Sequence, residues 1–111
     1  MGMFDKNSIS PKEAHKRMGE GGKYILLDVR TPEEYNRERL KDAKLIPIDE
    51  LVARAPKDLP DKKATILVYC QSGARAKSAV KLLTQMGYTD VSCFGGIANW
   101  PYEKISGSSR W

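Results

Sequence analysis

Runs of apolar residues divide this chain into a regular series of short elements. Tyr24–Leu27 and Ile66–Tyr69 are almost entirely apolar, as expected for strands that are buried on both faces. Shorter apolar runs at 45–48 and 90–94 also fit strands. After residue 70, apolar residues recur at helical spacing as far as Met86, which predicts a helix. Strands that alternate with helices predict an α/β fold, in which helices cover both faces of a central parallel sheet.

Capping signals place the starts of the first two helices. Ser10, Pro11 and Glu13 form a capping box with proline at the first helical position, which predicts a helix that ends near Met18. Thr31–Glu34 repeats this pattern and predicts a second short helix, which carries Tyr35 and Leu40.

A third helix and a loop are predicted between the two apolar strands. Asp49 is a candidate cap for a helix through Glu50–Arg54. Residues 55–63 contain Pro56, Pro60 and several charges, and this composition predicts a surface loop.

The length and composition fit one globular domain. The chain has 111 residues, of which 41% are hydrophobic and 30% are charged, and these are ordinary values for a globular protein. None of its apolar runs approaches the ~18 residues that a membrane-spanning helix needs. The first residues lack the basic segment and following apolar segment of a secretory signal. We therefore expect a cytoplasmic protein with no membrane partner.

The net charge of +5 comes from 19 basic and 14 acidic residues. The basic residues are scattered along the chain, which is typical of a solvated surface, and no nucleic-acid-binding motif with interleaved aromatic residues is present. We therefore expect no nucleic-acid partner. A modest positive charge does favour the approach of an anionic substrate. We expect a monomer or a weak dimer.

The candidate chemistry lies where the second apolar strand ends. Cys70 follows Ile66–Tyr69 directly, and the loop Gln71-Ser72-Gly73-Ala74 leads to Arg75 and the predicted helix. In open α/β sheets, ligands bind at the carboxyl ends of the strands. The N–H groups of such a loop and of the helix start form a concave anion site, which favours the thiolate of a cysteine at its centre. Arg75 would add a positive charge near the mouth of this site.

Two interpretations of Cys70 are open. An inert, buried cysteine at a strand end is common. The loop, with its glycine and arginine just before a helix, favours a nucleophile instead. A thiolate surrounded by N–H donors would accept an electrophilic atom from an anionic donor, and Gln71–Arg75 would hold the negatively charged adduct.

Cys93 and the single histidine, His15, determine which other kinds of site the chain could form. Two cysteines and one distant histidine are too few for a disulfide scaffold or a zinc site, and we expect no metal or organic cofactor. Cys93 could resolve an oxidised Cys70, although a packed strand residue is the favoured interpretation. Nothing in the sequence places His15 near Cys70, so a hydrolase of the Cys-His type would lack its base.

Three ordered motifs make the chain resemble a rhodanese domain. They are Leu27–Tyr35 with the downstream Ala43 and Ile46-Pro47, the loop Cys70–Arg75, and the segment Gly95–Trp100. The resemblance covers residues 8–105, with an N-terminal extension at 1–7 and a polar tail at 106–111. It implies a single rhodanese-like domain with about five strands in its parallel sheet.

The resemblance also implies roles for two residues at the end of the first strand. Asp28 and Arg30 match an aspartate and an arginine that organise the active-site edge by hydrogen bonding, so we expect Asp28 to support the site and Arg30 to be structural. A surface ion pair beside a capped turn is the alternative for Arg30. The segment Glu38–Asp42 departs from the usual Gly-His-Ile-x-Gly pattern, which is expected to affect the local turn more than the activity.

The function that the resemblance implies is sulfur transfer. The Cys70 thiolate would take the outer sulfur of a donor such as thiosulfate, and the resulting persulfide would pass it to cyanide or a cellular thiol. One alternative is a module that carries or binds a persulfide for a protein partner, such as a sulfur-carrier protein. A phosphatase or arsenate reductase is the other, but phosphatase loops place their arginine one position further from the cysteine than Arg75.

Overall fold

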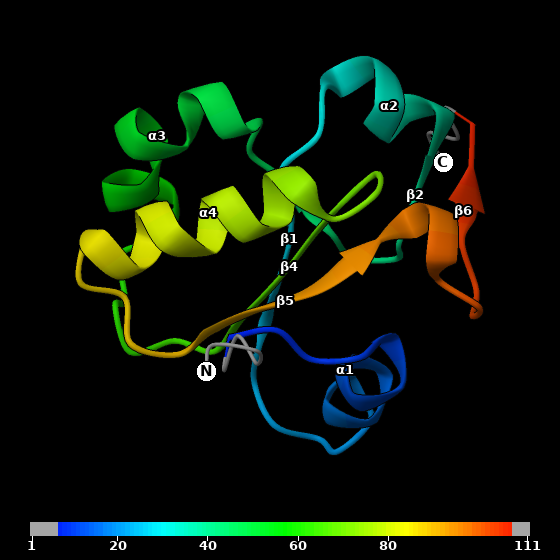
Figure 1. The fold of residues 1–111 in the computed structure, drawn as a ribbon, viewed down its shortest axis with the longest axis horizontal. Helices are drawn as coiled ribbons and strands as arrows, with labels where there is room; N and C mark the ends of the chain where they lie inside the picture. Colours follow the sequence, from blue (N-terminus) through cyan, green and yellow to red (C-terminus); the bar gives the residue numbers. More distant parts are fainter. Residues whose placement is uncertain (1–6, 108–111) are drawn as a thin grey trace.

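The computed structural model describes residues 7–107, and its central feature is a parallel sheet of four strands in the order β3-β1-β4-β5 (Figure 1). The elements in chain order are α1 (Pro11–Met18), β1 (Ile25–Asp28), α2 (Pro32–Arg37), β2 (Glu38–Arg39), β3 (Lys44–Leu45), the 3₁₀ helix η1 (Ile48–Glu50), α3 (Leu51–Asp58), β4 (Ile66–Cys70), α4 (Ala74–Gln85), β5 (Val91–Gly96), the 3₁₀ helix η2 (Ile97–Asn99) and β6 (Ile105–Ser106). The described part contains no helix that is long and apolar enough to cross a membrane.

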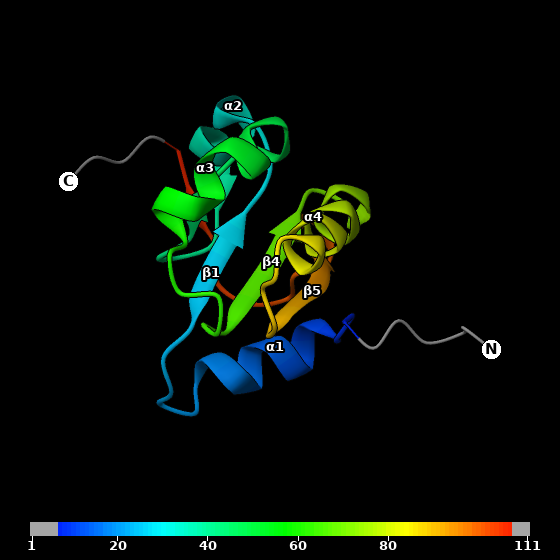
Figure 2. The ribbon, with the colours of Figure 1, turned by 90° about the vertical axis from the view of Figure 1, so that its left-hand side faces the viewer.

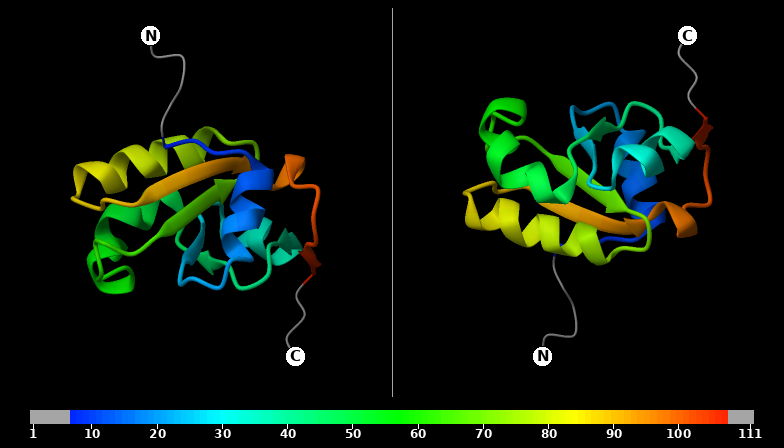
Figure 3. Two further views of the ribbon diagram at one scale, coloured as in Figure 1. Left: turned by 90° about the horizontal axis from the view of Figure 1, so that it is seen from below. Right: turned by 90° about the horizontal axis from the view of Figure 1, so that it is seen from above.

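Helices cover both faces of the sheet, which confirms the α/β prediction. On one face, Val68 of β4 belongs to a buried cluster with residues of α3 and α4, among them Leu51 and Leu83. On the other face, Leu67 belongs to a second cluster that contains Ala14 of α1. Figure 1 shows α3 and α4 above the strands and α1 below them, and in Figure 3 α1 lies in front of the strands in the view from below and behind them in the view from above. In Figure 2, α2 lies beyond the arrowhead of β1, at the carboxyl edge of the sheet.

The sheet has four strands where about five were expected. Beside β5, in place of a fifth strand, Ser8 forms a single parallel bridge to Cys93. The Ile9 N–H donates to the Cys93 carbonyl over 2.9 Å. Ser10 then caps α1 and Pro11 begins it, so the chain leaves the extended conformation before a full strand can form.

Helices α1 and α2 both begin at the capping residues that the sequence predicted. In α1, Ser10 accepts a hydrogen bond from the Glu13 N–H (3.0 Å), but the Glu13 carboxylate pairs with Arg17 and does not complete the box. In α2 the box is complete, because Thr31 accepts from the Glu34 N–H (3.2 Å) and the Glu34 carboxylate accepts from the Thr31 N–H (2.9 Å).

Helix α3 is longer than the sequence pattern predicted. We expected a loop from residue 55, but the helix continues through Pro56 to Asp58. Arg54 bridges Glu50 and Asp58 along the exposed side, and Ala55 is fully buried. These contacts outweigh the loss of one N–H donor at the proline.

The segment that departs from the rhodanese pattern forms an ordered turn. β2 pairs antiparallel with β6, and the Leu40 N–H donates to the Tyr69 hydroxyl (3.1 Å). Asp42 stands at the second glycine of the usual pattern and has a φ of 66°, a left-handed conformation that aspartate tolerates better than most residues. The backbone therefore keeps a conformation that suits glycine, although the glycine is absent.

The start of the expected tail is part of this paired region. Ser106 belongs to β6, and the Gly107 N–H donates to the Arg37 carbonyl (2.8 Å). The rest of the tail, 108–111, and residues 1–6 of the expected N-terminal extension lie outside the described residues.

Candidate functional site

Cys70 ends β4 with its sulfur inside the loop that leads into α4. The sulfur accepts hydrogen bonds from the backbone N–H groups of Gly73 (3.0 Å) and Ala76 (3.3 Å). Ala76 lies in the first turn of α4, where the N–H groups carry the positive end of the helix dipole. Cys70 is only 1% exposed. This arrangement stabilises a thiolate, or a negatively charged atom bonded to the sulfur.

Two glycines give the loop this shape. Gly73 has a φ of 113°, a left-handed conformation that a side chain would strain. Gly96 faces Cys70 across the β4–β5 ladder and touches the loop so closely that a Cβ atom there would lie 2.1 Å from the Gln71 carbonyl oxygen. The end of β5 therefore packs directly against the backbone of the loop, and only glycine fits at position 96.

We expect the Gly96→Ala variant to be both less stable and less active. The new methyl group would collide with backbone, so the loop must shift and its N–H groups must leave the Cys70 sulfur. Overpacking of this kind costs about 1–3 kcal/mol of unfolding free energy, and we expect at least a tenfold loss of kcat, about 1.4 kcal/mol in activation energy. Urea unfolding and a sulfur-transfer assay measure the two effects.

Gly22→Ala is the matched control for that substitution. A Cβ atom at Gly22 meets nothing within 4 Å. If Gly96→Ala kept the unfolding free energy and the kcat of Gly22→Ala, this result would contradict the close contact between Gly96 and the Gln71 backbone.

Asp28 and Arg30 form a buried ion pair behind the loop. The Arg30 guanidinium donates to both carboxylate oxygens of Asp28, at 2.7 Å for its shortest bond, and the two side chains are 0% and 2% exposed. Arg30 also donates to the Gln71 amide oxygen (3.2 Å) and to the Glu38 carbonyl (2.6 Å). The pair therefore ties the carboxyl end of β1 to the first loop residue.

Burial and charge act together on the groups around this pair. Burial alone lowers the pKa of Arg30, but the hydrogen bonds and the charge of Asp28 outweigh burial and raise it. The guanidinium carbon of Arg30 lies 5.5 Å from the centre of the Tyr69 ring. Burial, followed by the negative charge of Asp28, raises the pKa of the Tyr69 phenol. Both groups therefore keep their usual charge states at neutral pH.

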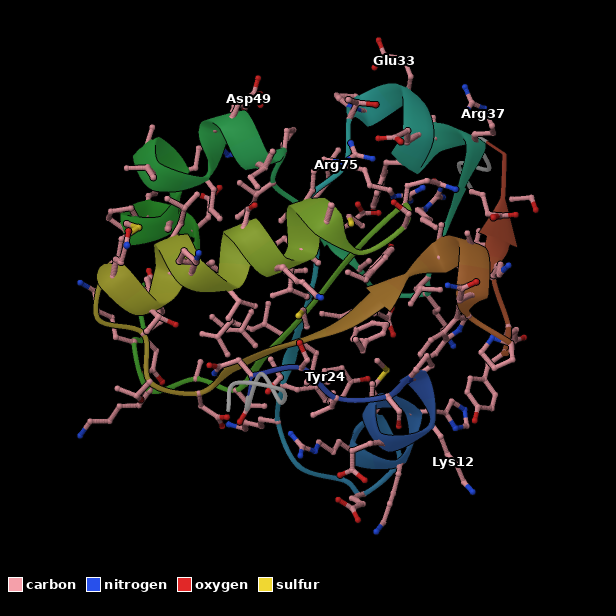
Figure 4. The ribbon with its side chains drawn as sticks, viewed as in Figure 1. Lys12, Tyr24, Glu33, Arg37, Asp49 and Arg75 are labelled. Atoms are coloured by element: carbon pink, nitrogen blue, oxygen red, sulfur yellow. The ribbon has the colours of Figure 1, made fainter. Side chains whose placement is uncertain are left out.

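Sequence reasoning missed Glu34 as part of the site. We interpreted it only as a capping residue, but Arg75 donates to its two oxygens at 2.8 and 2.9 Å. Figure 4 shows Arg75 between the start of α4 and α2. The charge that we expected at the mouth of the site is thus balanced by a carboxylate 41 residues away. Spacing along the chain gave no signal for this pair.

The Glu34–Arg75 pair predicts a specific dependence of stability on pH. The hydrogen bonds from Arg75 hold the pKa of Glu34 at about 2, below its ordinary value of 4.5. Because the folded-state pKa is lowered, the pair stabilises the protein fully above about pH 4.5, and the stabilisation is lost as the pH falls toward 2. We expect Glu34→Gln to cost about 0.5–1 kcal/mol at pH 7 and less at pH 2.5, as measured by urea unfolding.

Glutamine suits this test because its amide oxygen can still complete the capping box. The neighbouring Glu33→Gln variant is the control, since Glu33 is exposed on the same helix. An equal cost at both pH values for Glu34→Gln would contradict the ion-pair account.

Of the remaining candidates, Cys93 belongs to the same buried cluster as Cys70, whereas His15 lies apart from the Cys70 loop. Cys93 pairs with Val68 on the β4–β5 ladder, and its buried thiol lies 3.4 Å from the Ser8 hydroxyl. Both cysteines are free thiols. His15 stacks on Tyr102 at 3.8 Å between ring centres, on the α1 side of the sheet, whereas Cys70 belongs to the cluster on the opposite face. The structure therefore does not bring the histidine to the sulfur.

The fold and this loop define a class of protein, and comparison with known proteins identifies it. The family model for the rhodanese-like domain matches residues 10–102. This chain belongs to the rhodanese-like domain family.

Named relatives agree with this family. The chain is 38% identical to the thiosulfate sulfurtransferase PspE of Escherichia coli, over 73% of this chain and 78% of PspE. It is 33% identical to a sulfurtransferase of Allochromatium vinosum, over 85% of this chain and 87% of that protein. Relatives with these names support sulfur transfer as the general activity.

Solved structures give the same result for the fold. A rhodanese with anions from E. coli has a TM-score of 0.71 and 36% identity, and the match covers 77% of this chain and 100% of that one. A rhodanese-like domain protein from Staphylococcus aureus has a TM-score of 0.77 and 29% identity, with 87% and 93% of the two chains covered.

Proposed function

We propose that this protein transfers sulfur from an anionic donor such as thiosulfate to a thiophilic acceptor through a persulfide on Cys70. The observation that carries the proposal is the pair of N–H groups, from Gly73 and Ala76, that converge on the Cys70 sulfur at 3.0 and 3.3 Å. They stabilise the thiolate before reaction and the negative charge on the persulfide afterwards.

The first half of the reaction forms the persulfide. The Cys70 thiolate attacks the outer sulfur of thiosulfate and forms a new S–S bond. The S–S bond of the donor breaks, sulfite leaves with the electron pair, and the outer sulfur stays on Cys70 with one negative charge. The anion-binding loop stabilises the attacking thiolate, so the mechanism assigns no side chain as a general base for this step.

The second half returns the enzyme to its starting state. Cyanide or a thiolate attacks the outer sulfur of the persulfide. The bond between that sulfur and Cys70 breaks, and Cys70 leaves as the thiolate. Thiocyanate or a new persulfide is released.

The other loop residues have separate proposed roles. Gln71, Ser72 and Ala74 are exposed at the mouth, where they bind the donor, and Gly73 supplies an N–H to the sulfur. Arg75, which Glu34 holds in place, contributes to donor binding at the rim, where the carboxylate offsets its positive charge. Behind them, Asp28 and Arg30 position Gln71.

Two features support thiosulfate as the donor. The net charge of +5 favours an anion, and PspE, a relative at 38% identity, is named a thiosulfate sulfurtransferase. Cyanide or a cellular thiol as the acceptor and a cytoplasmic location remain predictions, which acceptor assays and cell fractionation test.

A persulfide carrier for a protein partner is the second candidate. The observation that favours it is a match, at 32% identity, to the probable adenylyltransferase/sulfurtransferase MoeZ of Mycobacterium tuberculosis, of which this chain covers only 24%. In a chain of that kind a sulfurtransferase unit is joined to another activity. Phosphatase or arsenate reductase chemistry is less well supported, because Arg75 is already paired with Glu34.

The test is to incubate the reduced protein with thiosulfate, record its intact mass, and then add cyanide and measure thiocyanate. We expect a gain of one sulfur atom and catalytic turnover, with the same results for Cys93→Ala. A sulfur adduct that passes to protein thiols but gives no turnover with cyanide would favour the carrier. A folded, reduced protein that gains no sulfur would overturn the proposal, and phosphate esters and arsenate would be tested next.

A further inference from the structure

The two arginines of the site are both paired with carboxylates. Arg30 is paired with Asp28 behind the loop, and Arg75, which follows the loop directly, is paired with Glu34 of α2. Each pair carries no net charge. The positive potential at the Cys70 sulfur therefore comes mainly from the backbone N–H groups of the loop and from the dipole of α4, which is equivalent to about half an elementary charge. Such a potential suits a single negative charge.

The Glu34 carboxylate is held in one position by hydrogen bonds from two sides. Thr31 donates to it from its N–H (2.9 Å) and its hydroxyl (3.3 Å), and Arg75 donates to both oxygens at 2.8 and 2.9 Å. A two-point contact of this kind is the strong form of an arginine–carboxylate pair. The carboxylate is ionised at neutral pH, because these bonds hold its pKa at about 2. A fixed negative charge therefore lies beside the guanidinium of Arg75.

Arg75 is close enough to Cys70 for the two charges to interact. The hydrogen bonds to Glu34 raise the pKa of Arg75 against the effect of burial, and the charge of Cys70 raises it further. By the same interaction, Arg75 stabilises negative charge at the sulfur. The side chains of Arg75 and Glu34 are 35% and 21% exposed. A charged donor that approaches the sulfur therefore interacts with both members of the pair.

We propose that Glu34 is a specificity-determining residue, because its charge offsets that of Arg75 and so limits the advantage of a doubly charged sulfur donor over a singly charged one. This inference rests on the proposed function, since it concerns the first half of the reaction. Thiosulfate, a dianion, and methanethiosulfonate, a monoanion, both offer an outer sulfur to the Cys70 thiolate. In each case that sulfur bonds to Cys70, the S–S bond of the donor breaks, and sulfite or methanesulfinate leaves with the electron pair.

The test measures persulfide formation alone, so that the acceptor does not enter. Reduced protein is mixed with each donor and quenched at intervals, and the gain of one sulfur in its intact mass gives a second-order rate constant. The quantity compared between variants is the ratio of the rate constant for thiosulfate to that for methanethiosulfonate. A change in the shape of the loop or in the reactivity of Cys70 affects both donors and largely cancels in this ratio, whereas a change in charge does not.

We expect Glu34→Gln to raise this ratio about three- to fivefold at low salt, because the unpaired charge of Arg75 attracts the dianion more strongly. The increase should shrink at high salt, which screens partly exposed charges. Glu33→Gln is the matched control. It removes the same charge from the neighbouring position, which is exposed and points away from Arg75 in Figure 4, and it should keep the ratio of the native protein.

A double-mutant cycle separates charge from structural support. Arg75→Gln leaves the Glu34 carboxylate unpaired, so we expect the ratio to fall about three- to fivefold. Glu34→Gln/Arg75→Gln has neither charge, and its ratio should return to within about twofold of the native value. If Arg75→Gln does not fold, the comparison of Glu34→Gln with Glu33→Gln still decides the question.

Three results would overturn the inference: a ratio that does not rise in Glu34→Gln, an equal rise in Glu33→Gln, or a rise in Glu34→Gln that persists unchanged in the double variant. A folded, reduced native protein that forms no persulfide with either donor would instead overturn the proposed function, and this inference with it.

Discussion

Replacing Cys70 with alanine is expected to abolish both the sulfur adduct and the turnover with thiosulfate. The proposed mechanism has one nucleophile, and the two N–H donors at 3.0 and 3.3 Å converge on its sulfur. Without the sulfur these donors have nothing to stabilise, so we expect a loss of at least about a thousandfold in kcat/KM, or ~4 kcal/mol of transition-state stabilisation. Thiocyanate formation and intact mass after incubation with thiosulfate measure the loss.

Two further variants make this result specific. Cys70→Ser keeps an acceptor for the same two N–H groups, but it has no sulfur to form a persulfide and should be equally inactive. Cys93→Ala removes the other buried thiol and should keep most of the activity. A sulfur adduct that persists in Cys70→Ala and disappears in Cys93→Ala would assign the nucleophile to Cys93 and contradict the proposed mechanism.

The parts of the site that are local in sequence could be predicted. A buried strand that ends in cysteine, followed by a glycine-containing loop and a helical pattern, predicts an anion site, and the N–H groups of Gly73 and Ala76 do reach the sulfur. The cap of α2 by Thr31 follows the same logic, because a capping box is defined within four residues. In both cases the interacting groups are neighbours along the chain.

The parts that depend on tertiary contacts could not be predicted. Glu34 has a complete local role as a capping residue, so its sequence context gave no reason to seek Arg75 as a second partner. The sequence predicts a strand that ends at residue 94, but β5 continues to Gly96, and the contact of Gly96 with the Gln71 backbone depends on how β5 lies against the loop. The length of α3 depends on contacts that Pro56 does not predict, namely burial of Ala55 in the core.

The buried ion pair of Asp28 and Arg30 makes a different prediction, about stability. We expect Arg30→Met to lower the free energy of unfolding by about 3–5 kcal/mol, because it leaves the Asp28 carboxylate fully buried without its partner. The Gln71 side chain would also lose the donor that holds it, at 3.2 Å. Urea unfolding at pH 7 measures the first effect, and the KM for thiosulfate measures the second.

A double-mutant cycle separates the uncompensated charge from the lost packing. Asp28→Asn/Arg30→Met has no buried charge at either position, so we expect it to recover more than half of the stability that Arg30→Met loses. It should not recover the KM, since Gln71 still lacks the guanidinium. If the double variant were as unstable as Arg30→Met, packing rather than charge would explain the loss. If it also regained the native KM, Arg30 would have no positioning role at the loop.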